Sequence, residues 1–534
     1  MIQRKQSTWI LLATILGSSM VFIDSSVVNV ALPRLQTDLA ASVTSVQWVV
    51  EVYILFLAAL MLVGGSLGDL WGRKRVFAVG IVLFALSSVW CGLAPNVSQL
   101  IAARAVQGIG GALLTPGSLA IIRSSFPGEQ RSRAVGRWSS FTAITSALGP
   151  LLGGWLVQHA SWRWIFFINV PLALVVLSIL YWRVPESRHE RESSPLDWLG
   201  ALLAALGLGA IVYGLIESNN LGLGHPVVLV SLVSGGIALV AFVLVELHSE
   251  APMMPLRLFH SWTFSGTNLL TLLLYAASLA TFFFLPFNLI GVQGYSPTAA
   301  GAAVLPYTLL LFLLSRWSGG LVNRYGAKLP LVIGPLIASL GFLIFAIPDT
   351  GGSYWTTFFP AIVILGLGMA ITVAPLTTTV LGAVDERYAG IASGINNAVS
   401  RIAGLLSIAI LSIFVVRVFN STLDIRIAML HVSPAVRHTL GAQRTMLVDA
   451  QIPASIQGMT RRAVQQAINE SFVAGFRLAM EIAAGLALAS ALCSLLLVSP
   501  CRDRFRASTM DMQHQDGHGK AAPMKAYRRY NSNK

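Results

Sequence analysis

Long apolar runs separated by short polar segments dominate the chain. No Asp, Glu, Lys or Arg occurs between Arg75 and Arg104, or between Glu217 and Glu246. A membrane-spanning α-helix needs about 20 mostly apolar residues, whereas the strands of a membrane barrel alternate over about ten. The pattern therefore predicts an all-α polytopic membrane protein and not a barrel. We expect fourteen spans, at residues 8–32, 45–67, 76–94, 98–122, 138–157, 164–183, 196–217, 225–246, 264–290, 298–318, 329–348, 354–381, 389–416 and 471–499.

Composition agrees with this interpretation. Of the 534 residues, 55% are hydrophobic and 11% are charged, whereas a typical globular domain carries about 25% charged residues. These values exclude a soluble multidomain enzyme, a disordered protein and a disulfide scaffold. The three cysteines, Cys91, Cys493 and Cys501, show no metal-ligand spacing, so neither a metal nor a cofactor is expected.

Basic residues predict the orientation of the chain. An even number of spans places both termini on one side, and most of the 36 Lys and Arg residues lie in segments on that side. Because cytoplasmic loops carry the excess of Lys and Arg, we expect both termini in the cytoplasm and the spans in a bacterial inner or plasma membrane. The net charge of +14 then reflects topology and not nucleic-acid binding.

Two similar loops divide the chain into halves. GGSLGDLWGRKR begins at Gly64 after the second span, and a degenerate copy, GGLVNRYGAK, begins at Gly319 after the tenth. The copies lie eight spans apart, so two extra spans separate two six-helix halves related as transporter repeats are. We predict a cytoplasmic amino terminus (1–7), a first half (8–183), two additional spans with linkers (184–263), a second half (264–499) containing a long external loop (417–470), and a cytoplasmic tail (500–534).

Three ionisable residues fall at a similar depth in the first half. Asp24, Glu51 and Arg104 each lie about 9–14 Å below the outer surface at 1.5 Å per residue. An ionisable side chain at mid-bilayer costs about 2.5–3.5 kcal/mol on insertion scales, so it requires a reason. Two carboxylates beside one guanidinium would titrate as a coupled set, which suits proton coupling, with Arg104 as the relay or as the group that sets the pKa of the carboxylates. The alternative is a static ion pair that only orients helices.

A cationic substrate that competes with a proton for this negative charge would give antiport by linkage. Polar residues within the spans are candidates for the substrate cavity. Trp48 could instead anchor its helix at the membrane–water interface. We also expect Arg401 to face Glu51 across the two halves in one state. The cavity candidates are Asn29, Gln47, Trp48, Gln107, Asn268, Asn396, Asn397 and Arg401.

Two further clusters occur in the spans, and the first allows two interpretations. Phe282, Phe283, Phe284 and Phe287 could pack in the core or against lipid, or could form a soft wall for flat lipophilic cations. On the last span, the residues at 477 and 481 form an Arg–Glu pair at helical i, i+4 spacing, which we expect to neutralise itself.

The loop after the second span is a candidate conformational latch. Gly65, Gly68 and Gly72 would let helix ends approach each other closely. Asp69 could accept hydrogen bonds from a neighbouring helix end or pair with Arg73. A plain basic loop is the alternative.

The fifth span carries a candidate hinge or seal between the halves. Gly149 and Pro150 interrupt its helical hydrogen bonding, because proline lacks an N–H group. Gly153 and Gly154 follow and permit tight packing.

Four motifs occur in order at successive spans. They are IDSSVVNVALP from Ile23, GGSLGDLWGRKR from Gly64, RAVQGIGGA from Arg104 and ALGPLLGG from Ala147. Together they resemble the motifs of fourteen-span drug:proton antiporters of the major facilitator superfamily. The chain departs from that pattern at Thr145, which replaces a glycine, at Ser26, where threonine is usual, and at Asn323, which replaces the acidic residue of the second loop.

The resemblance implies the major facilitator fold, with two six-helix halves plus two extra central helices. It implies roles for Asp24 and Arg104, and efflux of lipophilic, cationic drugs driven by the proton gradient through alternating access. The alternative is a narrower exporter of a metabolite, siderophore or lipid. Expected partners are small lipophilic molecules, protons and membrane lipids, without nucleic acid. A monomer is expected, and a periplasmic adaptor or outer-membrane partner is left open. No catalytic triad or phosphate-binding loop appears, so an enzyme is not expected.

Overall fold

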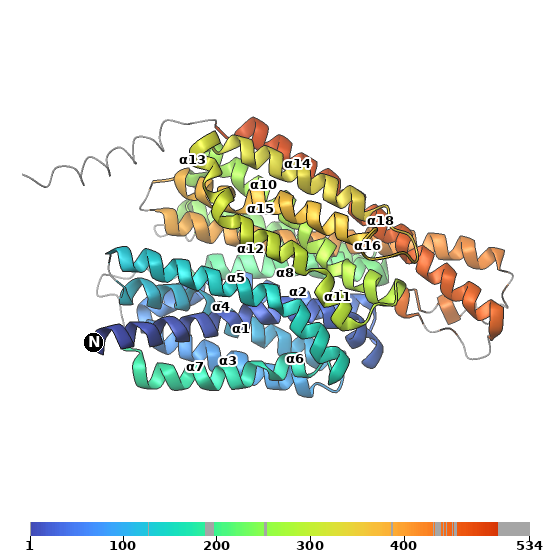
Figure 1. Ribbon diagram of the computed structural model, residues 1–534, viewed down its shortest axis with the longest axis horizontal. Coiled ribbons are helices and arrows are strands. Elements are labelled where there is room, and N and C mark those ends of the chain that lie inside the picture. Colours follow the sequence, from blue (N-terminus) through green and yellow to red (C-terminus); the bar gives the residue numbers. More distant parts are fainter. Residues whose placement is uncertain are drawn as a thin grey trace, which may run out of the picture.

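The computed structural model describes residues 2–126, 128–186, 197–249, 252, 254–385, 388–430, 432, 439–441, 443–444, 446–450, 452 and 457–499. Within these residues every regular element is a helix (Figure 1). Fourteen helical segments are long and apolar enough to cross a membrane. The predicted all-α class and number of spans are therefore confirmed.

The first bundle contains six spans. Its elements are α1 (Ile2–Asp38), α2 (Val43–Trp71), α3 (Arg73–Leu93), α4 (Val97–Ser125), α5 (Gly128–His159), α6 (Trp164–Phe167) and α7 (Asn169–Arg183). Helix α4 packs against both α2 and α3, and α1 packs against α5.

The second bundle also contains six spans. Its elements are η1 (Leu256–His260), α10 (Trp262–Pro286), the π-helical turn η2 (Phe287–Val292), α11 (Pro297–Ala303), α12 (Leu305–Gly319), α13 (Leu321–Tyr325), α14 (Lys328–Phe345), α15 (Phe358–Gly382), α16 (Ala389–Met429), η4 (Leu447–Asp449) and α18 (Gly458–Leu497). Helix α14 packs against α15 and α18, and α10 packs against α18 and α16. Figure 1 shows the two bundles one above the other.

The two intervening helices differ in their surroundings. Helix α8 (Trp198–Leu221) packs against α2 and α16, one from each bundle, whereas α9 (Pro226–His248) packs against α8. Large apolar side chains on α9, including Val230, Val233 and Ile237, are exposed. Helix α8 thus lies along the seam of the two bundles, and α9 presents its surface to lipid. The predicted division into domains stays a prediction.

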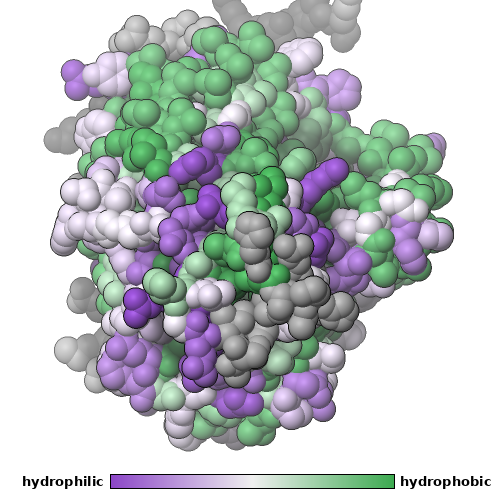
Figure 2. All heavy atoms as spheres, turned by 90° about the vertical axis from the view of Figure 1, so that its right-hand side faces the viewer, coloured by the Kyte–Doolittle hydropathy of each residue, from purple (hydrophilic) through white to green (hydrophobic). Residues whose placement is uncertain are grey.

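Successive spans run in alternating directions and so define two faces. We call the side on which α1 begins the amino-terminal face and the other side the opposite face. Helices α16 and α18 extend past the other spans at the opposite face (Figure 1). Parts of both helices belong to the predicted loop 417–470, because α16 ends at Met429 and α18 begins at Gly458. In this region Arg444 pairs with Asp424 at 2.7 Å, and Arg426 pairs with Glu470. Figure 2 views this face and shows hydrophilic side chains across its middle and lower part, below a hydrophobic area at the top.

Small residues set the spacing of α4 from its neighbours. A Cβ atom on Gly108 would lie 2.5 Å from the Tyr53 carbonyl oxygen, and one on Gly110 would lie 2.7 Å from the Phe84 nitrogen. Only glycine lets backbones approach this closely, and small residues have this role in membrane helix packing. The contact brings side chains of α4 into the centre of the first bundle.

Candidate functional site

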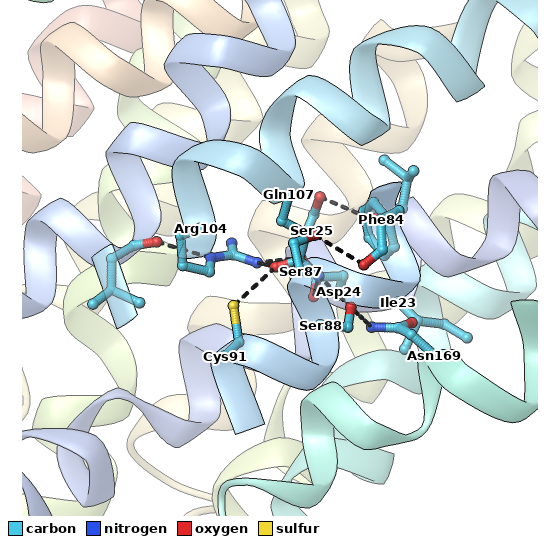
Figure 3. Close-up of polar contacts among 12 residues, drawn as sticks. Ile23, Asp24, Ser25, Phe84, Ser87, Ser88, Cys91, Arg104, Gln107 and Asn169 are labelled. Carbon is cyan, nitrogen blue, oxygen red and sulfur yellow. Dashed lines mark hydrogen bonds and ion pairs between the residues drawn. The ribbon is translucent and has the colours of Figure 1, made fainter. Parts of the chain in front are cut away.

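The first bundle encloses an ion pair between α1 and α4 (Figure 3). The Arg104 guanidinium donates to the Asp24 carboxylate at 2.5 Å, and the two side chains are 1% and 0% exposed. Gln107, one helical turn from Arg104, donates to the other Asp24 oxygen at 2.9 Å and accepts from Arg104 at 2.8 Å. Both oxygens of the buried carboxylate are therefore engaged.

Three more helices hold this network in place. Gln107 also donates to the Ser88 hydroxyl at 2.8 Å, and Asn169 of α7 donates to the same hydroxyl at 3.2 Å. From α2, the Val49 carbonyl accepts from the Arg104 Nε at 3.0 Å. Five helices of one bundle thus position a single carboxylate–guanidinium pair.

Aromatic rings cover the guanidinium. Its carbon lies 4.0 Å from the centroid of Tyr53 and 5.8 Å from that of Phe166. A desolvated cation over an aromatic face is stabilised by the ring quadrupole. Removal of one partner from a buried ion pair typically costs about 3–5 kcal/mol, because the remaining charge is unpaired. Proton uptake by the carboxylate would disturb the network in the same way.

Glu51 lies apart from this pair, although its depth suggested a common cluster. It accepts a hydrogen bond from Gln47 at 2.8 Å, and its other carboxylate oxygen is buried without a partner. No hydrogen bond or ion pair between described residues connects Glu51 with Asp24 or Arg104. At 100° per residue, Glu51 points about 200° away from Val49, whose face of α2 meets Arg104. Similar depth in the membrane was therefore not enough to predict a contact. Of the three expected residues, only Asp24 and Arg104 form a pair in this structure.

The expected pairing of Glu51 with Arg401 is not formed in this conformation. Arg401 is half-buried on α16 and forms no hydrogen bond or ion pair with a described residue. It lies within electrostatic range of the Tyr53 hydroxyl. Helix α16, which carries Arg401, packs against α2, which carries Tyr53.

A cavity of about 410 Å³ separates the two bundles. Its wall combines apolar and aromatic side chains with a few hydroxyls and one amide, and none of its lining residues is charged. The lining residues come from α1, α5, α10, α11, α12 and α15 and include Phe22, Ser25, Ser26, Asn29, Tyr275, Phe282, Tyr307 and Met369.

The cavity continues toward the amino-terminal face. An adjoining space of about 400 Å³ shares Ser146 and Thr308 with the first and reaches Ser139 and Ser315. At the opposite face, the backbone N–H of Thr298 donates to the Gln158 side-chain oxygen at 3.3 Å, and the Gln36 side chain donates to the Met446 carbonyl at 2.8 Å. Both hydrogen bonds join the first bundle to the second. The opposite face is thus closed by contacts, and the cavity lies on the side of the amino terminus.

Of the predicted cavity residues, Asn29 lines this space, and most of the others lie elsewhere. Gln47 and Gln107 are 0% exposed and bond to carboxylates. The Trp48 ring packs 6.1 Å from the ring of Tyr213 of α8 and does not line this cavity.

The asparagines of the second bundle connect helices. Asn396 of α16 donates to Asn268 of α10 at 3.2 Å and to Thr271 at 2.7 Å. Asn397 donates to the Ser393 carbonyl within its own helix at 2.9 Å. Polar side chains in apolar spans therefore serve helix packing here, which sequence position alone did not reveal.

The phenylalanine cluster divides between the core and the cavity wall, and its role toward cationic cargo stays a prediction. Phe282 lines the cavity and packs 4.7 Å from Tyr307, whereas Phe283, Phe284 and Phe287 are buried in the core. Tyr307 was missed because an aromatic residue in an apolar helix carries no signal that distinguishes a cavity wall from a core.

The loop after α2 holds α3 through an unexpected residue. Gly72 has φ +105°, and a Cβ there would lie 2.8 Å from the Glu186 carboxyl carbon. Glu186 follows α7, accepts from the Lys74 N–H at 3.0 Å and lies 3.7 Å from Arg75. A carboxylate at a helix amino terminus is favoured by the helix dipole. Its position just after the sixth span was the signal that could have indicated it.

The remaining latch residues differ from the expected close packing. A Cβ on Gly65 or Gly68 would meet neighbours at ordinary distances, 3.6 and 3.9 Å. Arg73 donates to the Ala120 carbonyl at 3.5 Å. The side chains of Asp69 and Asn323 lie outside the described residues, so their predicted roles stay predictions.

We expect Glu186→Gln to lower stability slightly. The change removes a negative charge from the start of α3, and such charges contribute about 0.3–1 kcal/mol at exposed helix ends. Thermal unfolding in detergent at low salt should show the loss. The difference from the unmodified protein should shrink in high salt, and a difference that is independent of salt would contradict this electrostatic role.

The glycine–proline segment of α5 contacts both α1 and the second bundle. Cβ atoms on Gly149 and Gly153 would collide with Ser26 and Val27 of α1. A Cβ on Gly154 would collide with the backbone of Pro297. A Cβ on Gly301 would likewise collide with the Pro150 carbonyl oxygen. The predicted role as a seal between the halves is consistent with this close backbone contact and stays a prediction.

The predicted neutral pair on the last span does not form. Arg477 donates instead to the carbonyl of Ala346, which directly follows α14 in the same bundle, at 2.8 Å. No ion pair joins Arg477 to Glu481 among the described residues. Both side chains are exposed. The end of α14 offers an unpaired carbonyl that competes for the guanidinium.

Comparison with known families places these features in context. Residues 14–408 match the family model described as Major Facilitator Superfamily. The chain is 33% identical to the multidrug resistance protein Stp of Mycobacterium tuberculosis over 89% of its own length and 88% of that protein. It is 32% identical to the tetracenomycin C resistance and export protein of Streptomyces glaucescens, with coverage of 91% and 90%.

Solved structures show the same fold. A bacterial homolog of the human lysosomal transporter Spinster, in an inward-facing conformation, matches 93% of this chain and 99% of its own with a TM-score of 0.64 at 20% identity. The xylose transporter XylE from E. coli matches with a TM-score of 0.55 at 14% identity, covering 93% of this chain and 98% of its own.

Proposed function

The chain belongs to the Major Facilitator Superfamily, and from this premise we propose that it exports lipophilic compounds in exchange for protons. The observation that carries the proposal is the uncharged cavity between the bundles beside a buried carboxylate–guanidinium pair. The names of its relatives, which include drug-resistance and export proteins, support a drug or antibiotic as cargo.

The lining of the cavity favours lipophilic cargo. Ligand sites bury most of a ligand against apolar and aromatic side chains and use a few polar groups for orientation. Here Phe282 and Tyr307 supply aromatic faces, while Ser26 and Asn29 supply polar groups. The aromatic faces suit a lipophilic cation, but no carboxylate lines the space, so we propose that neutral lipophilic compounds are carried as well.

The proton would bind at Asp24. Its carboxylate is buried and paired, so a proton there would leave the Arg104 guanidinium without its partner. Because the pair lies one residue from the cavity-lining Ser25, proton uptake and cargo occupancy would influence each other through α1. Linkage of this kind makes the two ligands exclude each other, which is the requirement for exchange. Glu51, with one unpartnered oxygen, is a second candidate for a proton.

Alternating access would follow from rocking of the two bundles about the cavity. If the amino-terminal face is cytoplasmic, as the basic residues predict, the present conformation is open toward the cytoplasm and ready to accept cargo. The tight contact of α5 with α11 would then be the closed external gate.

A narrower exporter is the second candidate. The relatives include proteins named for a single antibiotic, such as the cephamycin export protein CmcT of Amycolatopsis lactamdurans, 35% identical over 73% of this chain. A cavity that serves one compound class would need the same proton site but a more restrictive wall.

Transport in inverted membrane vesicles tests the proposal. A respiration-driven pH gradient is followed with a pH-sensitive dye while cationic, neutral and anionic lipophilic compounds are added. We expect proton efflux from the vesicles with several unrelated lipophilic compounds, and none in vesicles that lack the protein. A response to one compound class supports the narrower exporter, and no response to any compound contradicts proton exchange.

A further inference from the structure

Tyr53 of α2 carries a buried hydroxyl whose role the ion pair does not explain. The side chain is 0% exposed, and its ring lies 4.0 Å from the Arg104 guanidinium and packs edge-on against Phe84. The hydroxyl makes no hydrogen bond of normal geometry with the described residues. A buried donor without a partner costs about 1–3 kcal/mol, and phenylalanine would supply the same ring without that cost.

Tyr53 interacts both with the ion pair and with a residue of the cavity wall. Ser25, which lines the cavity, is next to it, and Asp24 and Arg104 are both within electrostatic range. Figure 3 shows Ser25 beside Asp24 on α1. Asp24 itself is 0% exposed and both its oxygens are engaged, so a proton from the cavity needs a group to pass through.

Charged and titratable groups surround this position from four helices. Asp24 approaches from α1, Arg104 from α4, Arg401 from α16, and Cys91 of α3 borders the same network through Gln107. Glu51, on α2 itself, points to the other side of the helix. Among the described residues, Tyr53 thus combines a ring contact with Arg104, an interaction with the cavity-lining Ser25 and a buried hydroxyl without a normal hydrogen bond.

We propose that Tyr53 transfers the proton between the cavity and Asp24. A hydronium ion in the cavity near Ser25 gives a proton to the Tyr53 oxygen and becomes water, while the Tyr53 O–H bond breaks and its proton joins the Asp24 carboxylate. One proton moves, the hydroxyl is regenerated, and Arg104 loses its partner. The reverse sequence releases the proton. This inference rests on the proposed proton exchange and assigns its path.

Tyr53→Phe separates this role from a structural one. The variant keeps the ring under Arg104 and removes an unpaired buried group, so we expect its melting temperature to be equal to or above that of the unmodified protein. We expect pH-driven efflux to fall about 10²-fold, a loss typical for a removed proton-transfer group. Substrate counterflow without a pH gradient, which exchanges cargo and moves no net proton, should stay within about twofold.

Two results would overturn the proposal. Tyr53→Phe with unchanged pH-driven efflux overturns it, as does an equal loss of efflux and counterflow. Tyr53→Leu should lose the ring contact as well and lower both activities. Tyr181→Phe, at an exposed tyrosine of α7, serves as the matched control. If Asp24→Asn also retains full pH-driven efflux, the proposed function itself fails, which distinguishes that failure from failure of the path.

Discussion

Asp24→Asn should reduce pH-driven efflux by a factor of about 10² or more, because the variant cannot accept and release a proton at the buried site. The amide is similar in size to the carboxylate and can still accept the hydrogen bond from Gln107. The measurement is the rate of cargo-induced proton movement in inverted vesicles, at equal amounts of protein in the membrane.

Loss of folding must be separated from loss of coupling. Asp24→Asn leaves Arg104 unpaired in an apolar interior, which costs about 3–5 kcal/mol and could by itself reduce the amount of protein. The double variant Asp24→Asn with Arg104→Gln removes both charges and should recover stability without recovering proton movement. Asp38→Asn changes an exposed ion pair with Arg34 on the same helix and should behave like the unmodified protein. Full pH-driven efflux in a well-inserted Asp24→Asn variant would remove Asp24 from the coupling role.

Gly154→Val should lower transport at least about tenfold by preventing closure of the opposite face. A side chain there would collide with the backbone of Pro297, where α5 and α11 meet. Overpacking of a tight contact costs about 1–3 kcal/mol, and about 1.4 kcal/mol shifts a two-state equilibrium tenfold. The conformation closed at the opposite face should lose population, and the exchange cycle should slow.

Accessibility of the cavity measures this shift. A cysteine placed at Asn29, in a chain with Cys91, Cys493 and Cys501 replaced by serine, should react faster with a membrane-impermeant reagent applied from the opposite face when Gly154 is valine. Gly236→Val is the matched control, because a Cβ on Gly236 of the lipid-facing α9 meets no atom within 4 Å. Equal reactivity in the two variants, or normal transport by Gly154→Val, would contradict the role of α5 as an external gate.

Individual polar residues show which roles the sequence pattern predicts and which it does not. Asp24 and Arg104 stand out in any apolar span, because a charge there has a high cost and needs a partner, and the structure joins them directly. Asn268 and Asn396 stand out for the same reason, yet they bond to each other between two helices. An uncharged polar residue can find hydrogen-bond partners in a helix contact or in a cavity. The sequence carries no signal that distinguishes these two environments.

The sequence by itself determined the number of spans, the helical class, the two related loops and the buried charges, because these depend on local composition and on the energetic cost of polar groups in lipid. Only the tertiary structure decided which way each side chain points. Glu51 and Tyr53 differ by two residues and a few ångströms of depth, yet Tyr53 covers Arg104 and Glu51 lies apart. The reason is that rotation about each helix axis is set by packing between residues distant in the chain, and that packing also shapes the cavity.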